Sequence, residues 1–95
     1  MTHDDAVKML EALGHTYRLQ VIEMLMSWPD GSSAGDLAEG LGIPGSTLSF
    51  HLKRLVDAGI LDQQRQHQQQ IYRLIPGRST EMAAFLTAHE AEGSE

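Results

Sequence analysis

Apolar residues recur at the spacing of a helix in five segments of the chain. In the first segment, over residues 4–13, they lie at i, i+3, i+4 and i+7, which places them on one helix face. These residues are Ala6, Met9, Leu10 and Leu13. Comparable spacing predicts four more helices, over about 17–28, 34–39, 44–58 and 79–91. The helix over 44–58 has an inner stripe of Leu48, Leu52, Leu55 and Val56.

Turn-forming residues separate the predicted helices. Gly14 ends the first, Pro29-Asp30-Gly31 stops the second, and Gly59 follows the fourth. Thr16 is expected to cap the second helix, because a hydroxyl can accept the hydrogen bond of an unpaired backbone N–H. Pro44 is expected at the first position of the fourth helix, where an N–H is not needed.

After Gly59 the pattern changes to that of extended chain. Residues 60–66 and 70–74 predict two strands, the second favoured by Ile71 and Tyr72. The polar tip between them is His67-Gln68-Gln69. A short helix, a tight turn, a second helix and a two-stranded ribbon together make a winged helix-turn-helix.

We therefore expect one domain over residues 1–95, mainly α with a small β-hairpin. It has about five helices and a two-stranded wing. The helix-turn-helix is expected at about 34–58 and the wing at about 60–75.

Length and composition narrow the classes of protein that fit. A chain of 95 residues has the size of one domain. The absence of cysteine excludes disulfides, thiol chemistry and cysteine-ligated zinc. No apolar run approaches the roughly 20 residues that span a bilayer, and the acidic N-terminus does not resemble a signal peptide. We expect a cytoplasmic protein with no membrane partner.

The net charge of −6 at first disfavours a nucleic-acid partner. The charges are unevenly distributed, however, since residues 46–78 carry five basic side chains and two acidic ones. An acidic protein can still face phosphates through one basic segment.

Small polar side chains mark the outer face of the helix over 44–58, as a helix that enters the major groove requires. Ser46, Thr47 and Ser49 are candidate contacts to base edges or phosphates, although Ser46 could instead cap the helix. Phe50 either touches a thymine methyl or packs against the wing or a second copy of the chain. His51 borders the apolar stripe, so it either packs there or contacts DNA.

Cations and the wing tip supply the remaining candidate DNA contacts. Lys53, Arg54 and Arg65 are expected to face phosphates. His67 and Gln68, at the tip of the wing, are expected to reach toward the minor groove. Because glutamine releases no counterions, a glutamine-rich wing predicts a weaker salt dependence than a basic one.

Several spaced segments resemble, in order, the ArsR/SmtB family of winged-helix repressors. The resemblance runs from about residue 6 to 76 and is carried by residues 12–19, 36–39, 46–55, 58–61 and 71–74. It implies a homodimeric bacterial transcription regulator, usually a repressor that leaves its operator when a signal binds. It also implies a dimer interface built from the first and last helices, about 4–13 and 79–91. The interface residues expected here are Met9, Leu10, Leu13, Met82, Phe85 and Leu86.

The hydrophobic pattern agrees with this implication. A domain this small cannot easily bury the apolar stripes of both terminal helices, and exposed stripes usually mark a partner. The alternative is that the stripes pack internally in a monomer. A two-fold dimer would set its recognition helices about 34 Å apart, which predicts an inverted-repeat operator in double-stranded DNA.

Many members of the family sense metals, but this sequence departs from both family sites. Ser33 and Gly35 stand where one site has a Cys-x-Cys pair. The other site, on the last helix, needs Asp-x-His and His-x-x-Glu, and only the second half is present, over residues 89–92. We expect no metal site and no cofactor, and the effector stays open. His15 is either a loop side chain, a pH-sensitive group or a ligand together with His3.

Two other classes of function are compatible with a small domain. The sequence has no paired acid and base, no phosphate-binding glycine loop and no activated nucleophile, so no enzyme is expected. A winged helix can also serve as a protein-interaction or dimerisation module with weak or no DNA binding. The net charge and the glutamine-rich segment 63–70 suit that alternative.

Overall fold

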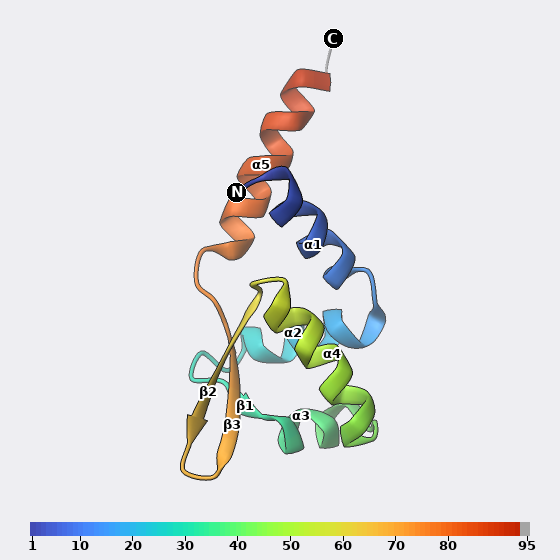
Figure 1. Ribbon diagram of the computed structural model, residues 1–95, viewed down its shortest axis with the longest axis vertical. Coiled ribbons are helices and arrows are strands. Elements are labelled where there is room, and N and C mark those ends of the chain that lie inside the picture. Colours follow the sequence, from blue (N-terminus) through green and yellow to red (C-terminus); the bar gives the residue numbers. More distant parts are fainter. Residues whose placement is uncertain (94–95) are drawn as a thin grey trace.

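The computed structural model describes the backbone of residues 1–93 and the side chains of residues 1–88. Its elements are α1 (His3–Leu13), α2 (Thr16–Met26), β1 (Ser32–Ser33), α3 (Ala34–Leu41), α4 (Gly45–Asp57), β2 (Leu61–Gln66), β3 (Gln69–Leu74) and α5 (Arg78–Gly93). Helices α1 and α5 lie at one end of the molecule, and α3, the start of α4 and the wing tip lie at the other (Figure 1). The predicted mainly α, winged helix-turn-helix fold is confirmed. No helix of the described residues is long and apolar enough to cross a membrane.

The sheet has three strands rather than the two predicted. Strands β2 and β3 form the antiparallel wing, with Leu61 opposite Leu74 and Gln66 opposite Gln69. Strand β1 adds to the other edge of β3, with Ser32 opposite Tyr72. The pattern could not predict β1, because two serines carry no alternation of apolar and polar residues.

The core is formed mainly by the inner faces of α2 and α4. The largest fully buried side chains are Val21, Leu25, Leu37, Leu48, Leu52, Leu55 and Leu61. Burial of each such side chain contributes about 1.5–3 kcal/mol. The predicted stripe of α4 is therefore confirmed for its three leucines, and it holds one face of α4 against the rest of the domain.

The turn of the helix-turn-helix follows from two residues. Gly42 ends α3 in the left-handed conformation, with φ 69°, and its N–H and that of Ile43 both donate to the carbonyl of Ala38. Pro44 then takes the N-cap position with φ −62° and ψ 147°. The prediction that Pro44 is the first helical residue was wrong by one position, because its extended ψ places it outside the helix.

The other helix ends differ from the predictions in small ways. His15, not Thr16, caps α2, since its Nδ1 accepts from the N–H of Tyr17 at 3.0 Å. Helix α2 ends at Met26, two residues before the predicted Trp28. Histidine lies outside the usual set of capping residues, which is why the sequence did not predict this cap.

The chain between α2 and β1 generates a testable prediction. Gly31 has φ +90°, and a Cβ there would lie 2.5 Å from the carbonyl oxygen of Tyr72. Gly42 has φ +69° with nothing within 4 Å of such a Cβ. Gly42→Ala should lower the free energy of unfolding by about 1–2 kcal/mol, the cost of the left-handed conformation. Gly31→Ala should lower it by more than that, because β1 must also move away from β3. Urea unfolding of both variants at one protein concentration checks this, and equal losses would contradict it.

Candidate nucleic-acid interface

The outer face of α4 is polar near its start. Ser46 and Ser49 are exposed and Thr47 is half-buried. Pro44 occupies the N-cap position of α4, and it forms no side-chain cap hydrogen bond. Ser46 lies inside the helix, so the alternative that Ser46 caps it does not hold. The first turn of α4 and the wing tip lie at the same end of the molecule (Figure 1). A helix start with uncapped N–H groups and short hydroxyl side chains can donate to phosphates and to base edges.

Phe50 lies on the surface with 53% of its area exposed. Its ring meets His51 edge-on at 5.4 Å, and the Arg54 guanidinium carbon lies 5.1 Å from its centroid. The described contacts of Phe50 are therefore with its own helix, and the contact to the wing that was one alternative is not formed. Arg54 lies on the flank of α4 that faces α1, where both residues line an open groove of about 770 Å³ together with Lys8 and Glu11.

His51 is 5% exposed. Of its two alternatives, it therefore packs in the interior, and its side chain is not available for a direct contact with DNA. Its Nδ1 accepts a hydrogen bond from Arg18 Nε at 3.2 Å. The rings of His15 and Tyr17 lie 4.3 and 5.6 Å from it. Burial, followed by the nearby His15 and Arg18, lowers the pKa of His51 below its ordinary value of 6.5, because each disfavours the imidazolium.

The candidate phosphate contacts differ in how they are held. Lys53 forms an ion pair with Asp57 at 3.2 Å, and both side chains are exposed, so the pair is weak and a phosphate can replace the carboxylate. Arg65 is exposed on β2. Arg73 is instead tied to Asp62 at 3.2 Å. Arg65 is thus the free cation of the wing among the residues whose side chains are described.

The wing tip is a tight turn of His67 and Gln68 between paired Gln66 and Gln69, one residue shorter than predicted. His67 has φ 57°, a conformation that usually requires glycine but that histidine adopts more readily than most residues. His67 and Gln68 are both exposed, so the tip presents an imidazole and an amide rather than a cluster of cations.

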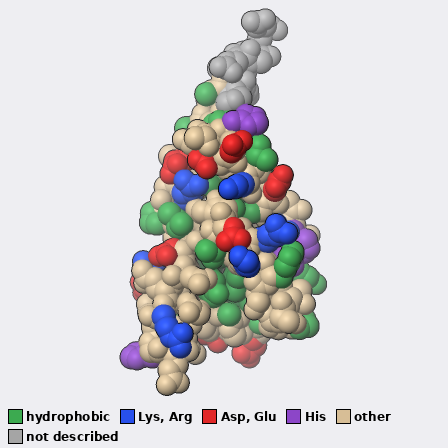
Figure 2. Space-filling model, viewed as in Figure 1, with side chains coloured by type: hydrophobic (Ala, Val, Ile, Leu, Met, Phe, Trp, Pro, Cys, Tyr) green, Lys and Arg blue, Asp and Glu red, His purple; other side chains and the backbone are tan. Residues whose placement is uncertain are grey.

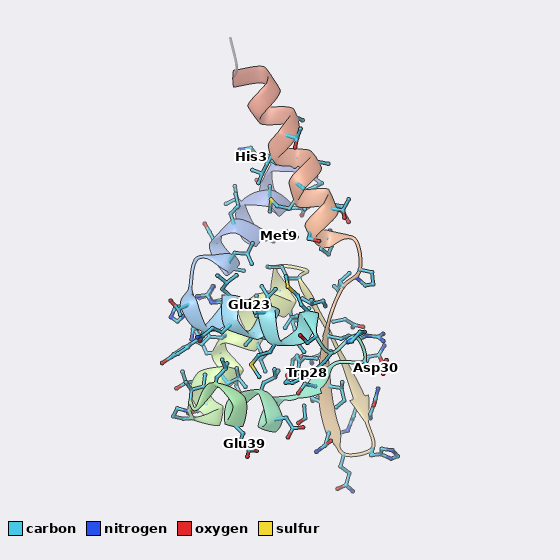
Figure 3. All side chains as sticks on the ribbon, turned by 180° about the vertical axis from the view of Figure 1, so that it is seen from behind. His3, Met9, Glu23, Trp28, Asp30 and Glu39 are labelled. Atoms are coloured by element: carbon cyan, nitrogen blue, oxygen red, sulfur yellow. The ribbon has the colours of Figure 1, made fainter. Side chains whose placement is uncertain are left out.

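The end of the molecule that carries these residues is not uniformly basic. Glu39 extends from α3 at this end (Figure 3), and acidic side chains appear at the foot of the space-filling view, to one side of the basic side chains at the lower left (Figure 2). The basic side chains proposed to face DNA are therefore confined to the wing and to the flank of α4.

The residues predicted for the dimer interface divide into two groups. Leu10 and Leu86 are 47% and 45% exposed, and Leu13 and Phe85 are half-buried. Met9 and Met82, however, are 2% and 7% exposed. Both methionines already belong to the core of the single chain, so little of their surface is left for a partner. Figure 3 shows Met9 where α1 faces α5.

The sequence analysis missed part of this apolar surface. A groove of about 470 Å³ runs between α1, α2 and α5, and its lining includes Leu19 and Met26 of α2 and Ile75 before α5. Leu19 and Met26 are 48% and 65% exposed. The signal was present, since the apolar residues of α2 are too many for one helix face.

The metal sites considered from the sequence find little support in the residues present. The Ser33 hydroxyl caps α3 by accepting from the N–H of Asp36 at 3.1 Å. The side chain of His89 lies outside the described residues. Among those described, no three His, Cys, Asp or Glu side chains are grouped as metal ligands. His15 is neither a free loop side chain nor placed with His3, because it caps α2 and stacks on His51.

Comparison with known proteins places the chain in a family. A family model described as a helix-turn-helix domain matches residues 13–64. The HTH-type transcriptional regulator YgaV of Escherichia coli is 38% identical over 71 residues, which are 75% of this chain and 71% of that protein. HlyU of Vibrio cholerae is 30% identical over the whole of both chains, with a TM-score of 0.70.

A second solved structure supports the fold alone, at 23% identity. It is the homodimeric winged helix-turn-helix DNA-binding domain of a possible ArsR-family regulator from Mycobacterium bovis, and it matches 97% of this chain and 83% of its own with a TM-score of 0.75. The family model and the likeness to YgaV agree with the resemblance seen in the sequence: the chain belongs to the helix-turn-helix family of transcriptional regulators and not to a family of enzymes.

Proposed function

We propose that this protein is a homodimeric repressor that binds an inverted-repeat operator through α4 and the wing. One observation carries the proposal. The leucines of α4 are buried in the core, which leaves Ser46 and Ser49 exposed and Thr47 half-buried. The start of α4 lies at the same end of the molecule as the wing tip (Figure 1). Such a helix can enter the major groove while the wing reaches the neighbouring groove.

Within this proposal each candidate residue has a role that follows from its exposure and chemistry. Thr47 and Ser49 read base edges, and Ser46 contacts a phosphate. Phe50, which is exposed, contacts a thymine methyl. Lys53, Arg54 and Arg65 neutralise phosphates, and His67 and Gln68 enter the minor groove. His51 supports α4 from within and is not assigned a DNA contact.

The dimer supplies the second half-site. Leu10 and Leu86 are exposed at the end opposite the wing tip, and the apolar groove beside α5 adds Leu19 and Met26. Apolar surface of this kind on a small domain is typical of a protein interface. The related domain from Mycobacterium bovis is homodimeric. A two-fold axis through α1 and α5 would leave both copies of α4 on one side.

A second function, a protein-interaction module with weak or no DNA binding, has an observation in its favour. The net charge is −6, and Glu39 lies at the same end as the wing tip (Figure 3). The two proposals predict different behaviour with DNA.

Fluorescence anisotropy distinguishes them, with the duplex upstream of the protein's own gene and a random duplex of equal length, at low and moderate salt. The repressor proposal predicts that two chains bind per operator, about 10³-fold or more tighter than to random DNA. Equal binding of both duplexes, or binding to neither, would favour the interaction module.

Arg65→Ala should weaken binding to operator and random DNA alike and reduce the salt slope by about 1 per site, because the variant neutralises one phosphate fewer. Gln63→Ala removes an exposed, uncharged side chain from the same strand, two residues before Arg65, and should leave the salt slope unchanged. A salt titration of both variants checks this. If Arg65→Ala left the slope at the wild-type value, Arg65 would not be a phosphate contact.

Thr47→Ala should instead reduce the preference for the operator over random DNA, by about 1–3 kcal/mol for each base that the threonine reads. Thr80→Ala, on the exposed surface of α5, is the matched control and should leave the preference unchanged. The measurement is the ratio of the two dissociation constants. An equal fall in affinity on both duplexes would show that Thr47 does not read bases.

A further inference from the structure

Arg18 of α2 joins two helices that meet it from opposite sides. Its Nη1 donates to the carbonyls of Glu11 and Ala12, both at 3.3 Å, in the last turn of α1. Its Nε donates to Nδ1 of His51, at 3.2 Å, in the middle of α4. A planar guanidinium holds its donors in a fixed fork, so one side chain sets the position of the recognition helix relative to the helix proposed to form the dimer.

This arrangement depends on the protonation state of His51. Nδ1 can accept from Arg18 only when it carries no proton, and a neutral imidazole then holds its proton on Nε2. Protonation at Nδ1 removes the acceptor and places a cation against the Arg18 guanidinium. The hydrogen bond then cannot form, and the two groups repel each other.

Burial, His15 and Arg18 all oppose the protonation of His51. The groups that face His51 come from α2, from the junction of α1 and α2, and from α4. They are Arg18 and Tyr17 of α2, His15 at the junction of α1 and α2, and Phe50 of α4, which carries Arg54 on its ring. The adjoining groove is lined by two carboxylates, Glu11 and Asp57. Three cations, Lys8, Arg18 and Arg54, line it as well.

We propose that Arg18 is a positioning residue for the recognition helix, and that protonation of His51 releases α4 from α1 and lowers the affinity for DNA. The inference rests on the proposed function. It assigns to His51 a role in regulating the interface rather than in touching the DNA.

The direction of the pH effect follows from the lowered pKa of His51. A histidine whose pKa is lowered by folding stabilises the folded arrangement at pH values above its pKa in the unfolded chain, here about 6.5. This stabilisation is lost as the pH falls through the lower pKa of the folded state. We therefore expect tight binding at pH 7.5 and weaker binding as the pH falls below 6.5.

The test compares the pH dependence of operator binding in the wild type and in His51→Asn. Asparagine keeps an acceptor oxygen, the same number of bonds from the backbone as Nδ1, but it does not titrate. From pH 7.5 to 5.5 the wild type should lose roughly threefold or more in affinity, within the limit of tenfold per pH unit for each proton taken up. His51→Asn should bind comparably at pH 7.5 and lose less.

The two proteins are identical at every other position, so the difference between their pH profiles belongs to residue 51. Arg18→Ala should bind DNA more weakly at pH 7.5. Like His51→Asn, it should lose less affinity than the wild type when the pH falls to 5.5. Identical pH profiles for the wild type and His51→Asn would overturn the proposal, as would an unaltered profile in Arg18→Ala.

A measurement on the wild type without DNA keeps the inference separable from the proposed function and from the folding of the variants. Nitrogen NMR of the imidazoles at pH 7.5 should show His51 with its proton on Nε2. On acidification the backbone amides at the end of α1 should shift in step with the His51 ring. A proton on Nδ1 at pH 7.5, or titration of His51 without a response in α1, would overturn the inference even if the protein binds DNA. Failure to bind DNA at any pH would sink the proposed function but leave this result standing.

Discussion

The structure depends on the burial of one face of α4. Leu48, Leu52 and Leu55 are no more than 1% exposed, and removal of any one would leave a cavity that costs about 2–5 kcal/mol. Because a helix has a fixed rise and twist, burial of this stripe decides which residues face outward. Ser46 and Ser49 are exposed and Thr47 is half-buried as a consequence of this packing, and the DNA-binding proposal begins from that consequence.

Two further constraints fix where this face points. At the start of α4, the left-handed Gly42 and the extended Pro44 set the angle between α3 and α4. In the middle of α4, Arg18 and His51 connect it to the end of α1. The first constraint is made of backbone geometry and does not change with conditions. The second is made of one hydrogen bond to a titratable ring, so it is the place where the orientation of α4 can respond to the solution.

Much of the fold could be predicted from the sequence because its helices are amphipathic and end at glycine or proline. What could not be predicted depends on contacts between distant residues. The two-residue strand of Ser32 and Ser33 exists because β3 offers it an edge. His15 caps α2 and His51 is buried because the α1–α2 junction packs on α4. The spacing of residues within one segment cannot predict such packing between distant segments. Met9 and Met82 matched an interface stripe in sequence, yet both are buried in the core of the single chain.

The central claim is that two chains present their α4 helices side by side at the spacing of successive major grooves. The chain has no cysteine, so Ser49→Cys introduces a single attachment site for a spin label on each α4. Electron–electron dipolar spectroscopy of the doubly labelled dimer should give a separation near 34 Å, the repeat of the DNA major groove. The absence of any dipolar coupling at micromolar concentration, or a separation far from this value, would contradict the account.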